Sequence, residues 1–304
     1  MIKAEIVAHS LNPQGDELIS VLCTFPRIIL AEINTHRMLS KNTSSSRAIP
    51  FKKMVEVVQE NPFIPIAWQK EHKGMQGTEY FTEEVDINAN ISNWLEGRDR
   101  AIATAFWLNE SGVTKQLANR LLEPFMWTTM LITGSKEGWE NFFNLRCPQY
   151  QIPNWDNSFK SWKEVCKELP YEEDTHYLNK AQFNKGQAEI HMMALAEAIY
   201  DVVNESTPKQ LVSGQWHIPF EDKINLRQLA NIIPHYQDEN GNIVDNKELI
   251  KARVKISISM SAHTSYTIVG NKPIKSYEKW IELHDKLIAY DPPHSSPMEH
   301  CGGS

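Results

Sequence analysis

The sequence has few cysteines, and their positions exclude the common cysteine-based frameworks. Its 304 residues contain four cysteines, Cys23, Cys147, Cys166 and Cys301. None has the CxxC spacing of a zinc site, and a long chain with so few cysteines is unlike a small disulfide-stapled secreted domain. We therefore expect no metal site and a reducing, cytoplasmic location.

Long apolar runs and an excess of positive charge are also missing. No segment reaches the roughly 18 apolar residues that a membrane-spanning helix needs, and MIKAEIVAHS lacks the features of a signal peptide. The 31 basic and 38 acidic residues give a net charge of −7, which is the wrong sign for binding a nucleic acid polymer. These absences predict a soluble protein with neither a membrane nor a nucleic acid as partner. A small anionic ligand stays possible, because a local arginine cluster can oppose the overall charge.

The sequence as a whole shows a pattern of strands and helices, and no linker divides it into separate domains. Residues 2–9 and 18–25 are rich in β-forming residues and flank the turn NPQGD, which predicts a hairpin. Residues 147–183 are rich in proline, tryptophan and charge, and we interpret them as an insertion in one domain, residues 1–304. Apolar spacing predicts a strand at residues 128–133 and helices at residues 27–39, 136–146, 186–203 and 275–290. It also predicts a helical pattern over about 90–122, interrupted near residues 109–112.

Residues 34–47, NTHRMLSKNTSSSR, follow the first predicted helix and are rich in hydroxyl groups. Arg37 and Arg47 flank the hydroxyls, and such donors between two arginines suit a phosphate. The segment contains no glycine, so it is neither a P-loop nor a dinucleotide-binding fingerprint. A capped surface turn and a phosphate pocket both fit these residues.

Two further segments carry reactive side chains. Arg146 ends the aromatic helix NFFNLR, where a cation beside apolar surface requires a partner or a ligand. A neighbouring cation lowers a thiol pKa, but we interpret Cys147 as a buried thiol rather than a nucleophile. HSSPMEH, residues 294–300, has possible metal ligands, but Pro297 interrupts the helical spacing of paired ligands. A polar turn that shapes a cofactor pocket is the preferred interpretation of this segment.

Together these motifs resemble the flavin-dependent thymidylate synthases. The R-H-R-x7-S signature of that family is similar to THRMLSKNTSS, which supplies His36, Arg37 and Ser45. SGVTKQLANRLLEP and NFFNLR resemble two later motifs and place Arg120 and Arg146 on the family's arginines. SAHTSY and HSSPMEH resemble motifs that precede the signature in the family but follow it here. This order resembles a circular permutation, an arrangement that we associate with a divergent, phage-encoded group.

The resemblance implies an α+β fold, with an antiparallel sheet flanked by helices, and a homotetramer with sites at subunit interfaces. It also implies methylation of dUMP at C5 to give dTMP, with methylenetetrahydrofolate as one-carbon donor, FAD as hydride carrier and NADPH as reductant. The residues expected to contact FAD are His36, Arg37, Asn42, Asn141, Ser265, His294 and Ser296. Those expected to bind the deoxypyrimidine monophosphate are Glu32, Ser45, Ser46, Arg47, Arg120 and Arg146, with Arg146 as the catalytic residue.

The sequence departs from the family at informative positions. Thr35 replaces a cation expected near the flavin, and Glu32 replaces a glutamine. A carboxylate accepts from an exocyclic amine, whereas glutamine both donates and accepts. One alternative is therefore a dCMP or dUMP hydroxymethylase or methylase on the same scaffold. An alternative from another class is a nucleotide- or flavin-binding protein without catalysis. Trp216 and His217 either shape such a substrate site or have a structural role.

Overall fold

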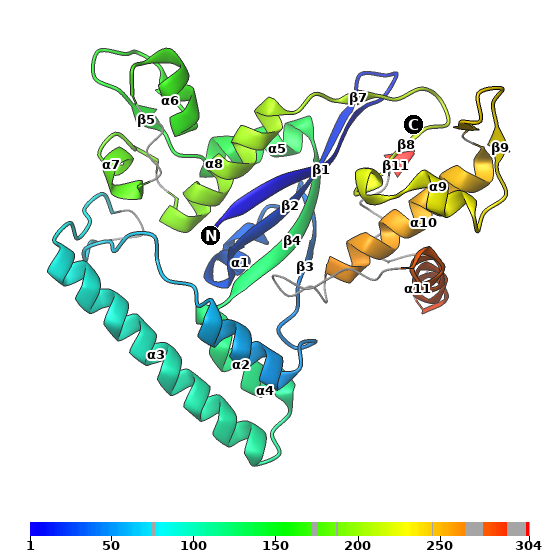
Figure 1. The fold of residues 1–304 in the computed structure, drawn as a ribbon. Helices are drawn as coiled ribbons and strands as arrows, with labels where there is room; N and C mark the ends of the chain where they lie inside the picture. Colours follow the sequence, from blue (N-terminus) through cyan, green and yellow to red (C-terminus); the bar gives the residue numbers. More distant parts are fainter. Residues whose placement is uncertain are drawn as a thin grey trace.

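A computed structural model describes residues 1–73, 77–171, 176–186, 188–244, 246–264, 276–290 and 302–303 (Figure 1). Three predicted flavin residues, Ser265, His294 and Ser296, lie outside these ranges, and so does the whole of HSSPMEH. Within the described ranges, no helix combines the length and apolarity needed to cross a membrane.

A five-stranded mixed sheet forms the centre of the fold, with the strand order β3-β4-β2-β1-β7. β1 and β2 form the predicted hairpin, and β4 contains the predicted strand. The sheet is not wholly antiparallel as expected, because the short β7 pairs parallel to β1. β7 follows a helix rather than a tight turn, and only a tight turn forces antiparallel pairing. The strands are β1 (Lys3–Leu11), β2 (Glu17–Pro26), β3 (Ser40–Thr43), β4 (Trp127–Ser135) and β7 (Lys209–Gln210).

β1 contains a β-bulge at Val7, which has no opposing residue in β2. A bulge of this kind places two consecutive side chains on the same face of the sheet. Beyond it, His9 and Ser10 lie on opposite faces, and each has a partner there. The Nε2 atom of His9 lies 2.7 Å from Oε1 of Glu17, and the hydroxyl of Ser10 lies 3.0 Å from Nδ1 of His217.

Two helices, α5 (Lys136–Arg146) and α8 (Ile190–Glu205), cover one face of the sheet (Figure 1). α8 begins later than the predicted residue 186, because the Glu189 carboxylate accepts hydrogen bonds from the first N–H groups of the helix. The core between the sheet and these helices is apolar. It includes Val21, Cys23, Met130 and Ile132 from the sheet, and Trp139, Phe142, Met192, Leu195 and Ile199 from the helices.

A third helix, α10 (Lys247–His263), lies on the opposite side of the sheet. Met260 packs there with a small cluster formed by Val7, Leu131 and Phe220. The resemblance matched SAHTSY to a strand of the family, but Ser261–His263 are the last turn of α10. A helix forms despite the β-branched residues of this segment, because its buried stripe packs on α9 and α11 and Asn246 caps its first turn.

The first predicted helix, residues 27–39, is much shorter than expected. The turn η1 (Arg27–Ile29) leads into α1 (Leu30–Ile33), and the helix ends there. Thr35 helps to end it, because its hydroxyl donates to the carbonyl of Glu32 at 2.7 Å. Residues 34–39 therefore form turns before β3 instead of a further helical turn.

The segment interpreted from the sequence as an insertion, residues 147–183, contains short elements that contact a buried carboxylate of α8. Glu197 is 8% exposed and accepts from the backbone N–H of Trp162 at 2.7 Å. It also accepts from the hydroxyl of Tyr150 and the ammonium of Lys180, both at 3.2 Å. This carboxylate lies where three parts of the insertion meet the core helix.

The remaining elements complete the described chain. They are α2 (Phe51–Glu60), α3 (Glu84–Glu110), α4 (Lys115–Ala118), η2 (Asn119–Phe125), β5 (Tyr150–Gln151), β6 (Ser158–Phe159), α6 (Trp162–Glu168), α7 (Tyr177–Ala181), β8 (Trp216–His217), η3 (Glu221–Lys223), α9 (Leu226–Ala230), β9 (Tyr236–Gln237), β10 (Ile243–Val244), α11 (Tyr277–Tyr290) and β11 (Gly302–Gly303).

Candidate functional site

Arg146 at the end of α5 meets two of the other predicted site residues. Its Nε atom donates to Nε2 of His36 at 2.9 Å, and its Nη1 atom donates to Oε1 of Glu32 in an ion pair. The side chains of Arg146 and Glu32 are 23% and 28% exposed, so both reach solvent. We call Glu32, His36, Lys41 and Arg146 the Arg146 cluster. It joins distant parts of the sequence, since His36 and Arg146 are 110 residues apart.

His36 is a neutral acceptor in this cluster. An arginine side chain stays protonated, so its Nε–H donates and Nε2 of His36 must carry a lone pair. Burial, together with the charges of Arg146 and Lys41, lowers the pKa of His36 to about 4. The imidazole is packed edge-on against Phe142 with 4.9 Å between ring centroids. At neutral pH it therefore positions the guanidinium without adding charge.

Glu32 has a carboxyl group whose pKa is moved in opposite directions by its surroundings. Burial raises the pKa and is the larger effect, whereas the charge of Arg146 lowers it, and the net direction is upward. The nearby charge of Glu189, at the start of α8, also raises it. This carboxylate lies at the guanidinium, where it can accept a hydrogen bond from a ligand amine.

Lys41 completes the cluster, and the sequence analysis missed it. Its ammonium donates to the carbonyls of His36 and, at 2.8 Å, of Leu39. Burial lowers the pKa of Lys41. Its position between His36 and the serine run could have indicated this role, because a lysine in a polar turn can donate to nearby backbone carbonyls. Its bonds fix the turn that presents His36.

The serine-rich segment forms a second polar site that is separate from the Arg146 cluster in its contacts. Ser46 is buried and donates to the Glu123 carboxylate, which forms an ion pair with Arg27 at 3.2 Å. Arg27 also donates to the carbonyl of Ser44 at 3.0 Å. Sequence analysis missed Arg27 and Glu123, although an arginine directly after Pro26 in an apolar segment is a signal for a partly buried ion pair.

Several predicted ligands stay on the surface of a single chain. Arg37, Arg47, Arg120 and Asn141 are exposed, and Ser45 is half-buried. Among the residues that the structure describes, no hydrogen bond or ion pair joins any of these five to the Arg146 cluster, so the chain alone does not bring the predicted ligands together.

Asn42 points away from the other predicted flavin ligands. It lies in β3, and its Nδ2 atom donates to the carbonyl of Ser261 in α10, at 2.5 Å. His36 instead packs on α5, which covers the opposite face of the sheet. The described flavin residues therefore do not converge on one cavity within one chain.

Cys147 lies next to Arg146 but has the environment of a core residue. It is 5% exposed, and burial raises the pKa of its thiol far above the ordinary value. A thiolate nucleophile requires the opposite shift. Among the described residues, no group of three or more histidine, cysteine, aspartate or glutamate side chains has the geometry to hold a metal ion.

Comparisons with known proteins give only distant similarities. No family model matches the sequence, and no curated protein matches it. The UMP/dUMP methylase PolB from Streptomyces cacaoi, bound with 5-Br dUMP, is 13% identical with a TM-score of 0.40, over 62% of this chain and 66% of that chain. The same protein bound with 5-Br UMP is 15% identical with a TM-score of 0.38, over 54% of this chain and 84% of that chain. Similarities this weak carry no argument about fold or function.

Proposed function

We propose that the protein methylates C5 of a deoxypyrimidine monophosphate, dUMP by default, in a reaction that depends on a folate one-carbon donor and a flavin. The proposal rests on the motifs that resemble the flavin-dependent thymidylate synthases. The observation that carries it is the contact of Arg146 with His36 and Glu32. Glu32 and His36 belong to the segment that contains the signature, whereas Arg146 ends NFFNLR, so the fold joins residues from two motifs of the resemblance.

The chemistry available to Arg146 suits a pyrimidine. Methylation at C5 requires that carbon to become nucleophilic, and negative charge then develops on the ring carbonyl oxygens. A fixed guanidinium stabilises such charge without reorganising during the reaction. His36 and Glu32 hold Nε and Nη1, whereas Nη2 makes no hydrogen bond or ion pair with any described residue. Arg146 therefore keeps donors for a ligand while its own position is set by the protein.

FAD does not fit the described residues of a single chain, because Asn42 points to α10 whereas Arg37 and Asn141 are exposed. When bound, a reduced flavin supplies the hydride that completes a methyl group. In our proposal the flavin lies between subunits of a homotetramer, which the resemblance implies, and NADPH reduces it.

The surface beside the Arg146 cluster has features that suit contact with another subunit. Gly138, Asn141 and Leu145 follow one face of α5 at intervals of three and four residues. Leu145 and Met38 are 59% and 48% exposed, and the carbonyl of Met38 lies so close to Gly138 that an added Cβ would be 3.1 Å from it. Exposed apolar side chains beside predicted ligands support a covered site in the oligomer.

A second candidate is the same type of reaction, methylation or hydroxymethylation, on dCMP. The observation that favours it is Glu32, whose carboxylate lies at Arg146. A carboxylate accepts from the exocyclic amine of cytosine, but it has no hydrogen to donate to the carbonyl of uracil. Glu32→Gln is expected to shift the preference from dCMP toward dUMP if cytosine is the substrate.

The deciding experiment incubates the purified protein with methylenetetrahydrofolate, NADPH, FAD and either dUMP or dCMP, and measures the mass of the product. A gain of one methyl group on dUMP supports the first candidate, and a product only from dCMP supports the second. Colourless protein that neither binds added FAD nor converts either nucleotide contradicts both. That outcome leaves the alternative of a nucleotide-binding protein without catalysis.

Arg146→Ala tests the assigned role directly. We expect the turnover number to fall by about 10²-fold or more, as for loss of a fixed donor to a developing oxyanion. The matched control is Arg100→Ala, which removes an arginine whose side chain is 80% exposed on α3. Flavin binding should persist in Arg146→Ala, and its loss would move Arg146 to the cofactor site.

A further inference from the structure

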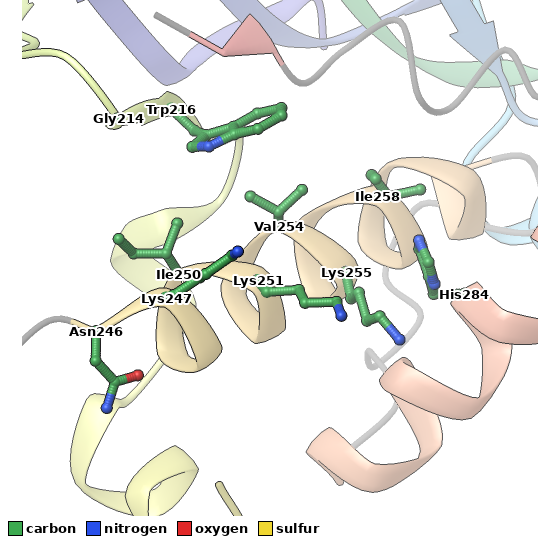
Figure 2. A pocket seen from close by; sticks show the side chains of 10 residues that line it. All are labelled: Gly214, Trp216, Asn246, Lys247, Ile250, Lys251, Val254, Lys255, Ile258 and His284. Carbon is green, nitrogen blue, oxygen red and sulfur yellow. The ribbon is translucent and has the colours of Figure 1, made fainter. Parts of the chain in front are cut away.

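A groove lies between Trp216 in β8 and one face of α10. Figure 1 shows α10 on the side of the sheet away from α5 and α8. The volume of the groove is about 650 Å³, within the range of small-molecule sites. We call it the Trp216 groove. Figure 2 shows Ile250 and Val254 pointing from α10 toward the Trp216 ring, with Lys247 and Lys251 on the same helix.

The aromatic wall of the groove is held in place from behind. Trp216 is 39% exposed, and the next residue, His217, points to the other side of the strand into the sheet. The two ring nitrogens of His217 lie 3.0 Å from the hydroxyl of Ser10 and 2.8 Å from that of Ser20. His217 is 2% exposed, so its buried hydrogen bonds fix the strand that presents the indole.

The opposite wall is also fixed. Ser257 in α10 donates to the carbonyl of Pro219 at 2.7 Å, and Arg253 forms an ion pair with Glu221 at 2.7 Å. These contacts tie the helix to the segment that follows β8. A preformed site binds its ligand without the entropy loss of ordering its own walls.

The groove has an apolar floor and a positively charged rim. Ile250, Val254 and Ile258 follow one stripe of α10, and a flat ring fits between this stripe and the indole. Lys247 and Lys251 are exposed and make no ion pair or hydrogen bond with any described residue. They are one helical turn apart, about 6 Å along the axis. These two ammonium groups give one end of the apolar slot a local positive charge, although the net charge of the chain is −7.

The other charges at the groove are already paired. The ammonium of Lys255 lies 2.8 Å from Oδ1 of Asp285, and Nδ1 of His284 lies 2.9 Å from the same oxygen. The Asp285 carboxylate therefore offsets Lys255 at one end of the groove. The positive charge that a ligand meets comes from Lys247 and Lys251 at the other end.

We propose that the Trp216 groove binds a ligand that combines a flat heteroaromatic ring with two anionic groups. The ring lies between Trp216 and the Ile250–Val254 stripe, and the anionic groups, phosphates or carboxylates, lie at Lys247 and Lys251. The groove and the Arg146 cluster lie on opposite faces of the sheet. The proposal rests on the residues of the groove alone and not on the proposed C5 methylation.

Calorimetric titration of the full chain tests the site with four probes. ADP carries a ring and phosphates, and pteroyltriglutamate carries a ring and carboxylates. Adenosine carries the ring without charge, and pyrophosphate carries charge without a ring. We expect ADP or pteroyltriglutamate to bind with a Kd below about 1 mM, at least about 10-fold tighter than the ringless or uncharged probe. The better of these two ligands identifies phosphate or carboxylate as the anionic group.

Two variants assign that binding to the groove. Trp216→Ala and the double change Lys247→Glu with Lys251→Glu should each raise the Kd at least about 10-fold. Trp216→Phe keeps a ring and should retain most of the affinity, and this variant separates stacking from loss of folding. Lys52→Glu, an exposed lysine on α2, is the matched control for charge. Absence of binding by both ligands overturns the proposal, and so does binding that survives the Trp216→Ala and double-lysine variants.

Discussion

His36 predicts a specific dependence of stability on pH. Its pKa is about 4 in the folded protein and 6.5 in the unfolded chain. Between these values the unfolded chain binds a proton that the folded protein excludes. The free energy of unfolding therefore falls as the pH falls through this window. At pH 7.5 both states are neutral at this position, and His36 makes no difference.

The magnitude follows from the two pKa values. At pH 5 the unfolded imidazole is almost fully protonated and the folded one is almost fully neutral, so the loss of stability relative to pH 7.5 is about 2 kcal/mol. Protonation in the folded state would also place a hydrogen on Nε2, against the Nε–H of Arg146. The hydrogen bond that now joins these atoms would become a repulsion.

Urea unfolding at pH 7.5 and pH 5, for the wild type and His36→Gln, measures this contribution. Glutamine still offers an oxygen to Arg146 but does not titrate, so the variant should lose about 2 kcal/mol less stability on acidification than the wild type does. The difference between the two proteins removes the contribution of every other titrating group. His72→Gln, at an exposed position, is the control and should follow the wild type. Equal losses in the wild type and His36→Gln would refute a neutral, arginine-bound His36.

Other predictions test the packing around the site. Glu197→Ala leaves the partners of a buried carboxylate unpaired and should destabilise the protein by roughly 3–5 kcal/mol, with limited proteolysis of the insertion appearing at lower denaturant than in the wild type. Gly134→Ala places a Cβ 2.4 Å from the side chain of Leu39 and should reduce the free energy of unfolding by about 1–3 kcal/mol; a smaller loss from the same change in a Leu39→Ala background would confirm the clash. Because burial raises the pKa of the Cys23 and Cys147 thiols, both should react with a thiol reagent only at the rate of unfolding, and fast labelling of either by mass spectrometry contradicts their burial.

Local signals predicted the elements in which pattern and caps agree. The hairpin of β1 and β2, the strand β4 and the helices α5 and α11 all follow strong turns, caps or apolar periods. The extent of α1 was wrong, because a helical period continues through residues 34–39 while the hydroxyl of Thr35 takes a backbone carbonyl and ends the helix. The hydroxyl of Thr35 and the next backbone N–H groups compete for the same helical carbonyls. Tertiary packing decides which of them wins, and a single sequence does not show that packing.

Glu32, His36 and Arg146 were predicted as site residues, but the geometry that joins them, and the part of Lys41 in it, were not. The predicted helix over residues 27–39 places Glu32 and His36 four residues apart on one helical face. In the structure the chain turns after Ile33, and each of the two side chains contacts Arg146. The buried contacts of Lys41 depend on carbonyls whose direction follows from that turn. The match of SAHTSY to a strand of the family was wrong for a similar reason, since α9 and α11 supply the packing that favours the helix α10.

The bulge in β1 acts as a phase shift in the strand, because one extra residue exchanges the faces reached by everything beyond it. Without the extra residue at Val7, His9 would face away from Glu17, and Ser10 would face away from His217. The position of Trp216 depends on the hydrogen bonds of His217. A single-residue deletion near Val7 would therefore reverse which side chains of β1 face each side of the sheet. It would break the Ser10–His217 hydrogen bond and so disturb the Trp216 groove, although no residue of β1 lines that groove.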